Sequence, residues 1–305
     1  MGDVVHALPA VSDMAQAIPG IQIDWLVEKS FAAMPSQHRA VDRVITLQWR
    51  KWRKSLRAPE TKQALTQWRQ EMRQQRYDLI IDMQGLVKSA LFTCFAQGPR
   101  AGYDWRSIRE PLASLFYGRK ARVSRQLHAV DRCRQLAALL LNYPLPATPP
   151  DFGLVTQANA WKPGEAPYAV LIPCASRPEK LWPQSDWVSV AQHLRQQGMD
   201  IAVMWGSPQE EQRAQAIAQA CGGHVPPFLT VAQAGDTLAG ARVVVGLDTG
   251  MTHLAAAHGR NTLGIYCDHE PGLAGVTGSG KVVSLGGKGQ VPSLTDVLAS
   301  LKKLS

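Results

Sequence analysis

Apolar and polar residues follow two patterns that alternate along the chain. Short apolar runs bounded by turn residues are typical of strands buried in a parallel sheet, and apolar positions three and four apart predict helices. The predicted strands are residues 21–27, 43–47, 77–82, 168–173, 201–205, 243–247 and 262–266. The predicted helices are residues 4–18, 60–76, 128–141, 231–239, 251–257 and 293–304. Because the two patterns alternate, we expect an α/β protein built on parallel sheets.

A proline-rich stretch divides the chain. Residues 143–150, YPLPATPP, hold four prolines, which is typical of a semi-rigid linker. The sequence therefore predicts a first domain over residues 1–150 and a second over residues 151–305. Ligands of parallel sheets lie beyond the carboxyl ends of the strands, so we expect functional residues there.

The first predicted helix has no strand ahead of it. In an α/β domain such a helix normally follows a strand, and omitting a central strand leaves its neighbours with unpaired edges. We therefore expect the first strand of the N-terminal domain to be missing from this chain. Our hypothesis is that Met1 is an internal residue of a longer natural chain.

Positive charge is concentrated in the first half. The whole chain has a formal net charge of +9. Residues 1–150 hold 22 Lys and Arg against 12 Asp and Glu, a net charge of +10, whereas residues 151–305 carry −1. The asymmetry predicts an anionic partner for the first half: a nucleic acid, an acidic lipid surface or a phosphorylated substrate. A merely solvated basic face is the alternative.

Cysteine usage and hydropathy bear on the compartment. The five cysteines are far apart and form no Cys-x-x-Cys pair. This spacing favours a reducing compartment and argues against a disulfide framework or a zinc site. We find no run of about 18 apolar residues and no secretory signal. We therefore expect a cytoplasmic protein.

Residues 243–260, VVVGLDTGMTHLAAAHGR, combine a strand, a tight turn and a small-residue helix. Thr249 is placed to cap that helix, and Gly250 lets a ligand approach the backbone closely. The N–H groups at a helix start favour an anion by about 0.3–1 kcal/mol. Asp248 adds a hydrogen-bond acceptor at this turn. His253 adds a hydrogen-bond donor whose state depends on protonation of the imidazole. An ordinary strand-to-helix junction explains the same residues equally well.

A cationic cluster follows the second predicted strand. Residues 49–57, WRKWRKSLR, place five cations around two tryptophans. A charge run of this kind is most often a solvated loop or helix face. Alternatively it clamps phosphates or carboxylates, because arginine holds either group through two parallel hydrogen bonds.

Four motifs together resemble a known enzyme family. They are Met-Gly-Asp at 1–3, YDLIIDMQGLVKS at 77–89, RPEKLWP at 177–183 and DTGMTHLAAA at 248–257. In these motifs and their order the chain is similar to the ADP-heptose glycosyltransferases of lipopolysaccharide core assembly. The resemblance implies a GT-B fold, in which two Rossmann-like, doubly wound domains face a central cleft. It assigns the acceptor to the first domain and ADP-heptose to the second, with the last helix free to pack back on the first domain.

The resemblance also implies a reaction. Heptose would move with inversion from ADP-L-glycero-β-D-manno-heptose to the Kdo of Kdo2-lipid A. The especially close resemblance of residues 109–117, REPLASLFY, favours this acceptor over a later one. Asp3 matches the family's general base, which contributes roughly 10²–10⁴ in rate. Lys180 matches the lysine that neutralises the donor phosphates. No Asp-x-Asp metal motif is present, so we expect no metal and no cofactor besides the donor substrate.

Further positions match binding residues of the family. Those on the donor side are Ala175, Ser176, Lys180, Glu210, Asp248, Thr249, Gly250 and His253. Those on the acceptor side are Arg50, Lys51, Arg53, Lys54, Arg109 and His128. Without the resemblance, Glu210 is simply an acid suited to a first helical turn. Three departures are Ala175 for a threonine, Lys51 for an arginine, and residues 267–272 for a Gly-Pro-Thr turn.

Two other functions stay open. In the first, the enzyme transfers heptose to a later, already heptosylated core. In the second, the chain binds a nucleotide without transferring sugar. Nucleic-acid binding is disfavoured, because no recognisable module accompanies the basic residues. We expect peripheral association with the cytoplasmic face of the inner membrane, where anionic lipids attract a basic patch by about 1 kcal/mol per cation. The sequence does not fix the oligomeric state.

Overall fold

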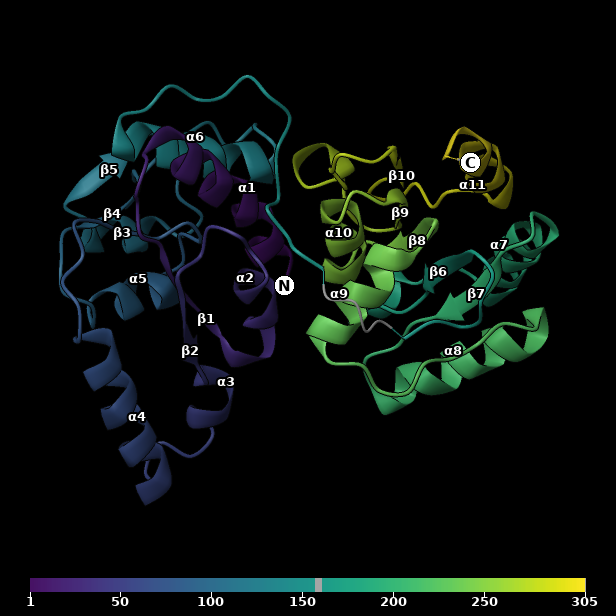
Figure 1. Ribbon diagram of the computed structural model, residues 1–305, viewed down its shortest axis with the longest axis horizontal. Helices are drawn as coiled ribbons and strands as arrows, with labels where there is room; N and C mark the ends of the chain where they lie inside the picture. The colour runs from purple at the N-terminus through teal and green to yellow at the C-terminus, as the bar shows by residue number, and fades with distance from the viewer. Residues whose placement is uncertain (157–160, 305) are drawn as a thin grey trace. The chain divides into compact units, whose positions relative to one another are not determined.

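The computed structural model describes residues 1–156 and 161–304, which form two compact units (Figure 1). The N-terminal unit comprises residues 6–148, and the C-terminal unit comprises residues 1–5 and 149–305. The division after residue 148 falls inside the proline-rich stretch, two residues from the position expected. The first five residues group with the C-terminal unit, which the sequence did not indicate.

Five parallel strands form the sheet of the C-terminal unit, in the order β10-β9-β8-β6-β7. They are β6 (Tyr168–Ile172), β7 (Asp200–Val203), β8 (Val243–Leu247), β9 (Asn261–Tyr266) and β10 (Val282–Gly286). β6 and β8 are buried at every position, as expected for strands covered on both faces. β10 was not predicted, because it is a half-buried edge strand enclosed between glycines.

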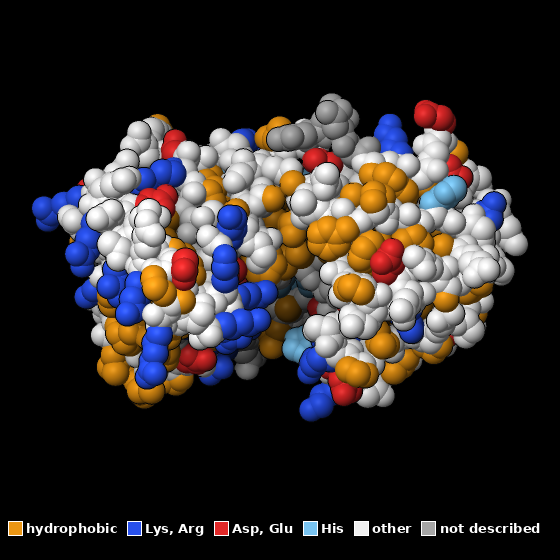
Figure 2. All heavy atoms as spheres, turned by 90° about the horizontal axis from the view of Figure 1, so that it is seen from below, with side chains coloured by type: hydrophobic (Ala, Val, Ile, Leu, Met, Phe, Trp, Pro, Cys, Tyr) orange, Lys and Arg blue, Asp and Glu red, His pale blue; other side chains and the backbone are white. Residues whose placement is uncertain are grey.

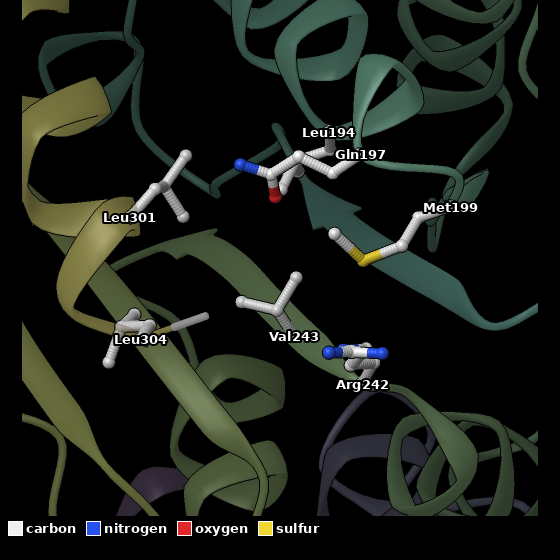
Figure 3. Close-up of a pocket in the computed structure, with 7 residues that line it drawn as sticks. All are labelled: Leu194, Gln197, Met199, Arg242, Val243, Leu301 and Leu304. Carbon is white, nitrogen blue, oxygen red and sulfur yellow. The ribbon is translucent and has the colours of Figure 1, made fainter.

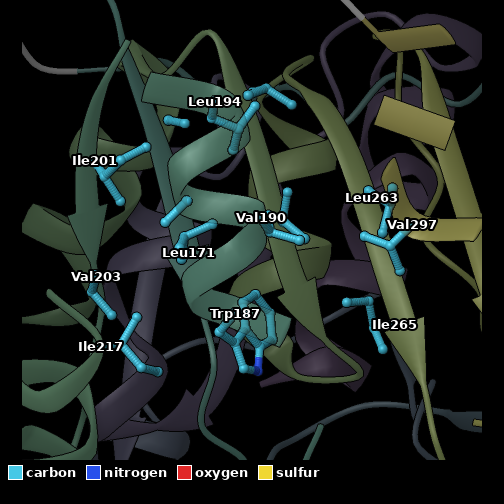
Figure 4. Close-up of a cluster of buried hydrophobic side chains, with 14 of the residues drawn as sticks. Leu171, Trp187, Val190, Leu194, Ile201, Val203, Ile217, Leu263, Ile265 and Val297 are labelled. Carbon is cyan, nitrogen blue, oxygen red and sulfur yellow. The ribbon is translucent and has the colours of Figure 1, made fainter. Parts of the chain in front are cut away.

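Helices cover both faces of this sheet. On one face, α7 (Gln184–Gln196) and α8 (Pro208–Cys221) share a cluster of buried side chains with Val243 and Val245 of β8 (Figure 4). Successive strand residues point to opposite faces, so Val244 and Gly246 face the other way. There Thr252 of α10 (Gly250–Ala257) lies directly over Gly246, and α10 packs on α9 (Val231–Gly240). The C-terminal unit is therefore doubly wound.

The last helix, α11 (Leu294–Leu304), belongs to the C-terminal unit. Our expectation that it also packs back on the first domain stays a prediction. Val297, Leu301 and Leu304 lie in the same buried cluster as α7, and α11 packs on α7, β9 and β10. The apolar stripe of this helix is thus buried against α7 and the outer strands of the sheet.

The N-terminal unit holds two parallel sheets. β1 (Asp24–Glu28) pairs with β2 (Arg43–Leu47), and β4 (Arg100–Tyr103) lies between β3 (Ile80–Ile81) and β5 (Arg119–Ala121). The run predicted at 77–82 is a strand only at residues 80 and 81. β4 and β5 were not predicted, because the segments RAGY and RKA carry charged and small residues instead of an apolar run.

Helices α1 (Gly2–Ala17) and α6 (Ala129–Leu141) cover these strands. Val11 of α1 and Ala137 of α6 share an apolar cluster with Trp25 of β1 and Ile81 of β3. The other helices are α2 (Ala33–Ser36), α3 (Trp49–Trp52), α4 (Pro59–Met72), α5 (Val87–Thr93), η1 (Lys29–Phe31), η2 (Pro111–Phe116), η3 (Pro178–Lys180) and η4 (Pro271–Leu273). Within residues 1–156 and 161–304, no helix combines the length and apolarity needed to cross a membrane.

A buried ion pair joins α1 to α6. Arg134 Nε donates to Asp13 Oδ2 over 2.7 Å, and the two side chains are 6% and 5% exposed. The same guanidinium donates to the carbonyls of Pro146 and Thr148, over 3.2 and 3.1 Å. One arginine therefore holds two helices and the end of the N-terminal unit together.

We predict that Arg134→Met lowers the free energy of unfolding by about 3–5 kcal/mol, because it leaves the Asp13 carboxylate buried without its partner. Chemical denaturation followed by circular dichroism measures the change. The matched control is Arg57→Met, at an exposed position, which should shift stability by no more than about 0.5 kcal/mol. Equal denaturation midpoints for Arg134→Met and the unmodified protein would contradict the prediction.

Candidate active site

The turn between β8 and α10 provides no side-chain cap for the helix. Thr249 occupies the N-cap position as predicted, but its side chain makes no capping hydrogen bond. Its hydroxyl lies 3.4 Å from that of Thr252, which donates to the Leu247 carbonyl over 2.6 Å. The expected capping by Thr249 is therefore wrong. No oxygen of that side chain occupies the helix N-terminus, where an anion is favoured.

Lys180, Asp248 and His253 come together at this turn. Lys180 Nζ lies 2.5 Å from Asp248 Oδ2 and 3.2 Å from the Asp248 carbonyl oxygen. His253 Nε2 lies 3.5 Å from the other carboxylate oxygen of Asp248. Lys180 follows β6 and Asp248 follows β8, and these two strands are paired neighbours. The pairing brings to one point two side chains that are 68 residues apart.

The Asp248 carboxylate stays ionised at this site. Burial alone would raise its pKa, but hydrogen bonds from His253 and Lys180 outweigh burial and hold the pKa well below its usual range. Both Lys180 and Asp248 are largely shielded from solvent, with side chains 16% and 15% exposed. A lysine fixed in this way presents a located positive charge beside the start of α10.

The first residues of the chain lie against the same turn. A Cβ added to Gly250 would stand 2.5 Å from the Cβ of Met1, so no other residue fits there without displacing Met1. Asp3, exposed in the first turn of α1, belongs to the same compact unit as Lys180 and Asp248. The carboxylate matched to a general base and the residues matched to a donor site thus occur in one unit.

Glu210 and the loop after β6 form the next part of the site. The Glu210 carboxylate accepts from the Gly206 N–H over 2.8 Å, and Ser207 caps α8, in whose first turn Glu210 lies. The Cys174 thiol, immediately before Ala175 and Ser176, donates to the Glu210 carbonyl over 3.7 Å. Burial raises the pKa of Cys174 to about 12, so this thiol is protonated and is no nucleophile at neutral pH.

Two arginines in this region, Arg213 and Arg177, were not among the predicted site residues. Arg213, on α8, donates to the carbonyls of Pro173 and Trp182, over 3.2 and 2.6 Å. It therefore holds both ends of the loop that carries Ala175, Ser176 and Lys180. The sequence signal was weak, because an arginine one turn after Glu210 is typical of an ordinary helix.

The altered loop at 267–272 contacts the same region. Arg177 Nη2 lies 2.7 Å from Asp268 Oδ2, which joins the loop after β6 to the loop after β9. Asp268 is one of the residues that replace the family's Gly-Pro-Thr turn. The departure seen in the sequence thus creates an ion pair at the edge of the donor-matched residues.

The acceptor-matched residues lie in the N-terminal unit, each beyond the carboxyl end of a parallel strand. Arg50, Lys51, Arg53 and Lys54 follow β2, Arg109 follows β4 and His128 follows β5. The four cations after β2 and Arg109 are exposed, and the Arg50 guanidinium also lies over the Phe31 ring. His128 accepts from the Val130 N–H through Nδ1 and caps α6, so it has a structural role as well. Figure 2 shows Lys and Arg side chains gathered over the N-terminal unit.

The C-terminal unit also contains a cavity of about 230 Å³ between α7, β8 and α11, away from the predicted residues (Figure 3). Met199, Arg242 and Val243 line it at the amino ends of the strands, the edge opposite to Lys180 and Asp248. It therefore adds nothing to the candidate site. In the part of the chain that the structure describes, no three His, Cys, Asp or Glu side chains are grouped to hold a metal ion.

Comparison with known proteins identifies the family. A model of glycosyltransferase family 9 (heptosyltransferase) matches residues 65–300. The chain belongs to this family. It is 41% identical over 308 residues to lipopolysaccharide heptosyltransferase 1 of Escherichia coli (strain K12), covering 100% of this chain and 96% of that protein.

Two solved structures resemble this family 9 chain closely. The E. coli heptosyltransferase WaaC with ADP has a TM-score of 0.91 and 38% identity, covering 100% of this chain and 97% of that one. The complex of WaaC with ADP-2-deoxy-2-fluoro heptose has a TM-score of 0.87, 38% identity, and coverage of 99% and 95%. The predicted GT-B fold and the prediction of a glycosyltransferase are both confirmed.

His258, the C-cap of α10, gives this enzyme a titratable group at the end of that helix opposite to the donor-matched turn. Burial lowers its pKa from 6.5 to about 4, an effect that Asp236 opposes. The unfolded chain therefore binds a proton between these two pH values that the folded chain does not bind. It follows that stability contributed by neutral His258 is present above about pH 6.5 and is lost as the pH falls toward 4.

The titration of His258 makes the free energy of unfolding fall by up to about 1.4 kcal/mol per pH unit as the pH is lowered from 6.5 to 4. We predict that His258→Gln abolishes this contribution, so that the stability of the variant falls less steeply over the same range. Denaturant unfolding at a series of pH values measures it. The exposed His269→Gln should leave the pH dependence unchanged. Parallel stability curves for His258→Gln and the unmodified enzyme would show that the buried imidazole does not titrate as described.

Proposed function

We propose that the enzyme transfers L-glycero-D-manno-heptose from ADP-heptose to the Kdo of Kdo2-lipid A, the first heptose addition of the lipopolysaccharide inner core. The observation that carries this proposal is the Lys180–Asp248–His253 group at the start of α10, in a family 9 chain. Its relatives named lipopolysaccharide heptosyltransferase 1, and the WaaC complexes with ADP and with a fluorinated ADP-heptose, support a nucleotide-sugar donor.

On the donor side, Lys180 and the N–H groups at the start of α10 would meet the diphosphate. Positive charge fixed before the reaction stabilises charge that develops on the departing ADP, and needs no reorganisation at that moment. Asp248 would orient Lys180, and Glu210 would bind the ribose. Ser176 would supply one hydroxyl near the phosphates, while Ala175 supplies none. These residues can carry the phosphate charge without a metal ion, which we expect to be dispensable.

Asp3 would act as the general base. Its carboxylate would take the proton from the acceptor hydroxyl as that oxygen attacks the anomeric carbon and ADP leaves with the bonding electrons. Attack from the side opposite to ADP inverts the anomeric configuration. Its membership of the compact unit that contains the donor-matched residues supports this role.

On the acceptor side, the cations after β2, together with Arg109 and His128, would bind the carboxylates and phosphates of Kdo2-lipid A. The net charge of +10 on residues 1–150 supports an acidic acceptor. The same charge supports peripheral binding to the cytoplasmic face of an anionic inner membrane.

We predict that Asp3→Asn lowers kcat by about 10²–10⁴ in the transfer of heptose from ADP-heptose to Kdo2-lipid A, because the amide cannot take up the proton. ADP affinity, measured by calorimetry, should be unchanged. The matched control is Asp296→Asn, at an exposed acid in the first turn of α11, which should keep full activity. Equal rates for Asp3→Asn and the unmodified enzyme would remove Asp3 from the mechanism.

We predict that Lys180→Met lowers kcat by about 10²–10³, because it removes the charge that stabilises departing ADP. Lys180→Arg keeps the positive charge and should restore part of the loss. Steady-state rates with ADP-heptose and Kdo2-lipid A measure both. If Lys180→Met and Lys180→Arg are equally impaired, shape rather than charge matters at this position.

The same assay separates the other functions. Turnover only with an already heptosylated core would make the enzyme a later heptosyltransferase. ADP binding with no transfer to either acceptor would indicate a nucleotide-binding protein without transferase activity.

A further inference from the structure

Three exposed leucines lie on two adjacent elements of the N-terminal unit. Leu112 and Leu115 on η2 are 59% and 68% exposed, and Leu91 on α5 is 46% exposed. Helices η2 and α5 pack side by side, and Ala113 and Ala90 from their inner faces are buried in one cluster. A single exposed leucine is ordinary, but three on packed neighbours form an apolar surface that needs an explanation. We call Leu91, Leu112 and Leu115 the leucine face.

The geometry of η2 directs two of these leucines outward together. In a 3₁₀ helix, residues three apart lie one above the other. Leu112 and Leu115 therefore share one side of η2, while Ala113 and Ser114 are buried on the other. Helix η2 therefore exposes two large apolar side chains to solvent, while its small residues contact the core.

Exposed cations lie near the leucine face along the chain. Lys88 lies one turn before Leu91 on α5, and the chain on either side of η2 carries exposed arginines and one exposed lysine. They are Arg106, Arg109, Arg119, Lys120, Arg122 and Arg125. Between residues 105 and 125 the exposed acid is Glu110, whose carboxylate accepts from the Val87 N–H over 2.7 Å and so belongs to the local framework. Apolar side chains bordered by cations match an anionic lipid surface, which offers hydrocarbon and phosphate together.

The leucine face adjoins the acceptor-matched edge of the sheet. The Glu110 N–H donates to the Gly85 carbonyl over 3.1 Å, so η2 begins against the loop that follows β3. Gly85 has a positive φ of 70°, and a Cβ there would stand 2.9 Å from the Ile108 side chain, which keeps the two loops in close contact. Arg109 lies between this contact and Leu112. A surface bound by the leucine face would therefore lie next to an acceptor-matched arginine.

We propose that the leucine face is the membrane-docking surface of the enzyme. Leu91, Leu112 and Leu115 enter the interface of an anionic bilayer while the flanking cations bind lipid phosphates. The proposal rests on the proposed function in one respect, because a lipid-anchored acceptor gives the enzyme a reason to work at a bilayer. Docking there would present an acceptor headgroup to Arg109 without drawing its acyl chains out of the membrane.

Co-sedimentation with vesicles tests the proposal without any substrate. The full chain should bind vesicles of phosphatidylethanolamine with phosphatidylglycerol, and bind vesicles of phosphatidylcholine weakly. Leu112→Ser with Leu115→Ser should weaken binding to the anionic vesicles about tenfold or more, because two partly inserted leucines are lost. Raised salt should weaken binding of the unmodified enzyme, since the cations are exposed.

The matched control is Leu139→Ser, a leucine that is 52% exposed on α6, which packs on β4 and β5. It should bind vesicles as the unmodified enzyme does. Leu91→Ser alone should weaken binding severalfold, which tests the face independently if the double variant fails to fold. Denaturation midpoints identify any such failure.

Equal vesicle binding by the double variant and the unmodified enzyme would overturn the proposal. So would a change in sedimentation velocity caused by the double variant in the absence of vesicles, because that result would make the face a contact between copies of this chain. Transfer to a deacylated, water-soluble Kdo acceptor should be unchanged in the double variant. Absence of that transfer in the unmodified enzyme would contradict the proposed function but not the docking surface.

Discussion

Parallel pairing of strands is the constraint on which the site depends. β6 and β8 run in the same direction and in register, so the loops that follow them leave the sheet at the same edge. Lys180 comes from one loop and Asp248 from the other, and their contact closes the gap between the loops. The hydrophobic core below needs only apolar side chains of suitable size, but the edge needs these two residues at these two positions.

The two units share an architecture of parallel strands and helices, but their cations are arranged differently. In the C-terminal unit, a partly buried carboxylate at a helix start pairs with one lysine and fixes the position of its ammonium group. In the N-terminal unit the acceptor-matched cations are numerous and exposed after β2 and β4. A fixed charge suits a diphosphate whose position must be defined during reaction, whereas exposed cations suit an acidic surface that is recognised over a wide area.

The sequence predicted what is local and missed what depends on distant contacts. Strand β8, the turn at 248–250 and helix α10 are continuous in sequence, so their pattern was sufficient. Strands β4 and β5 have no apolar run, and only their neighbours stabilise them as strands. The family resemblance, rather than periodicity, assigned Lys180 and Asp248 to the donor side, and the direct contact between them was not predicted. Arg213 was missed because its role lies in two carbonyl groups, which no side-chain pattern reveals.

Helix α8 links two parts of the donor region through residues one turn apart. Glu210 lies at its first turn, and Arg213 holds both ends of the loop that carries Lys180. Residues in a helix turn by about 100° each, so inserting one residue between these two would swing the arginine away from both carbonyls. Natural variation in the length of this family should therefore spare that turn of α8 and accumulate near its far end, at Gly222 and beyond.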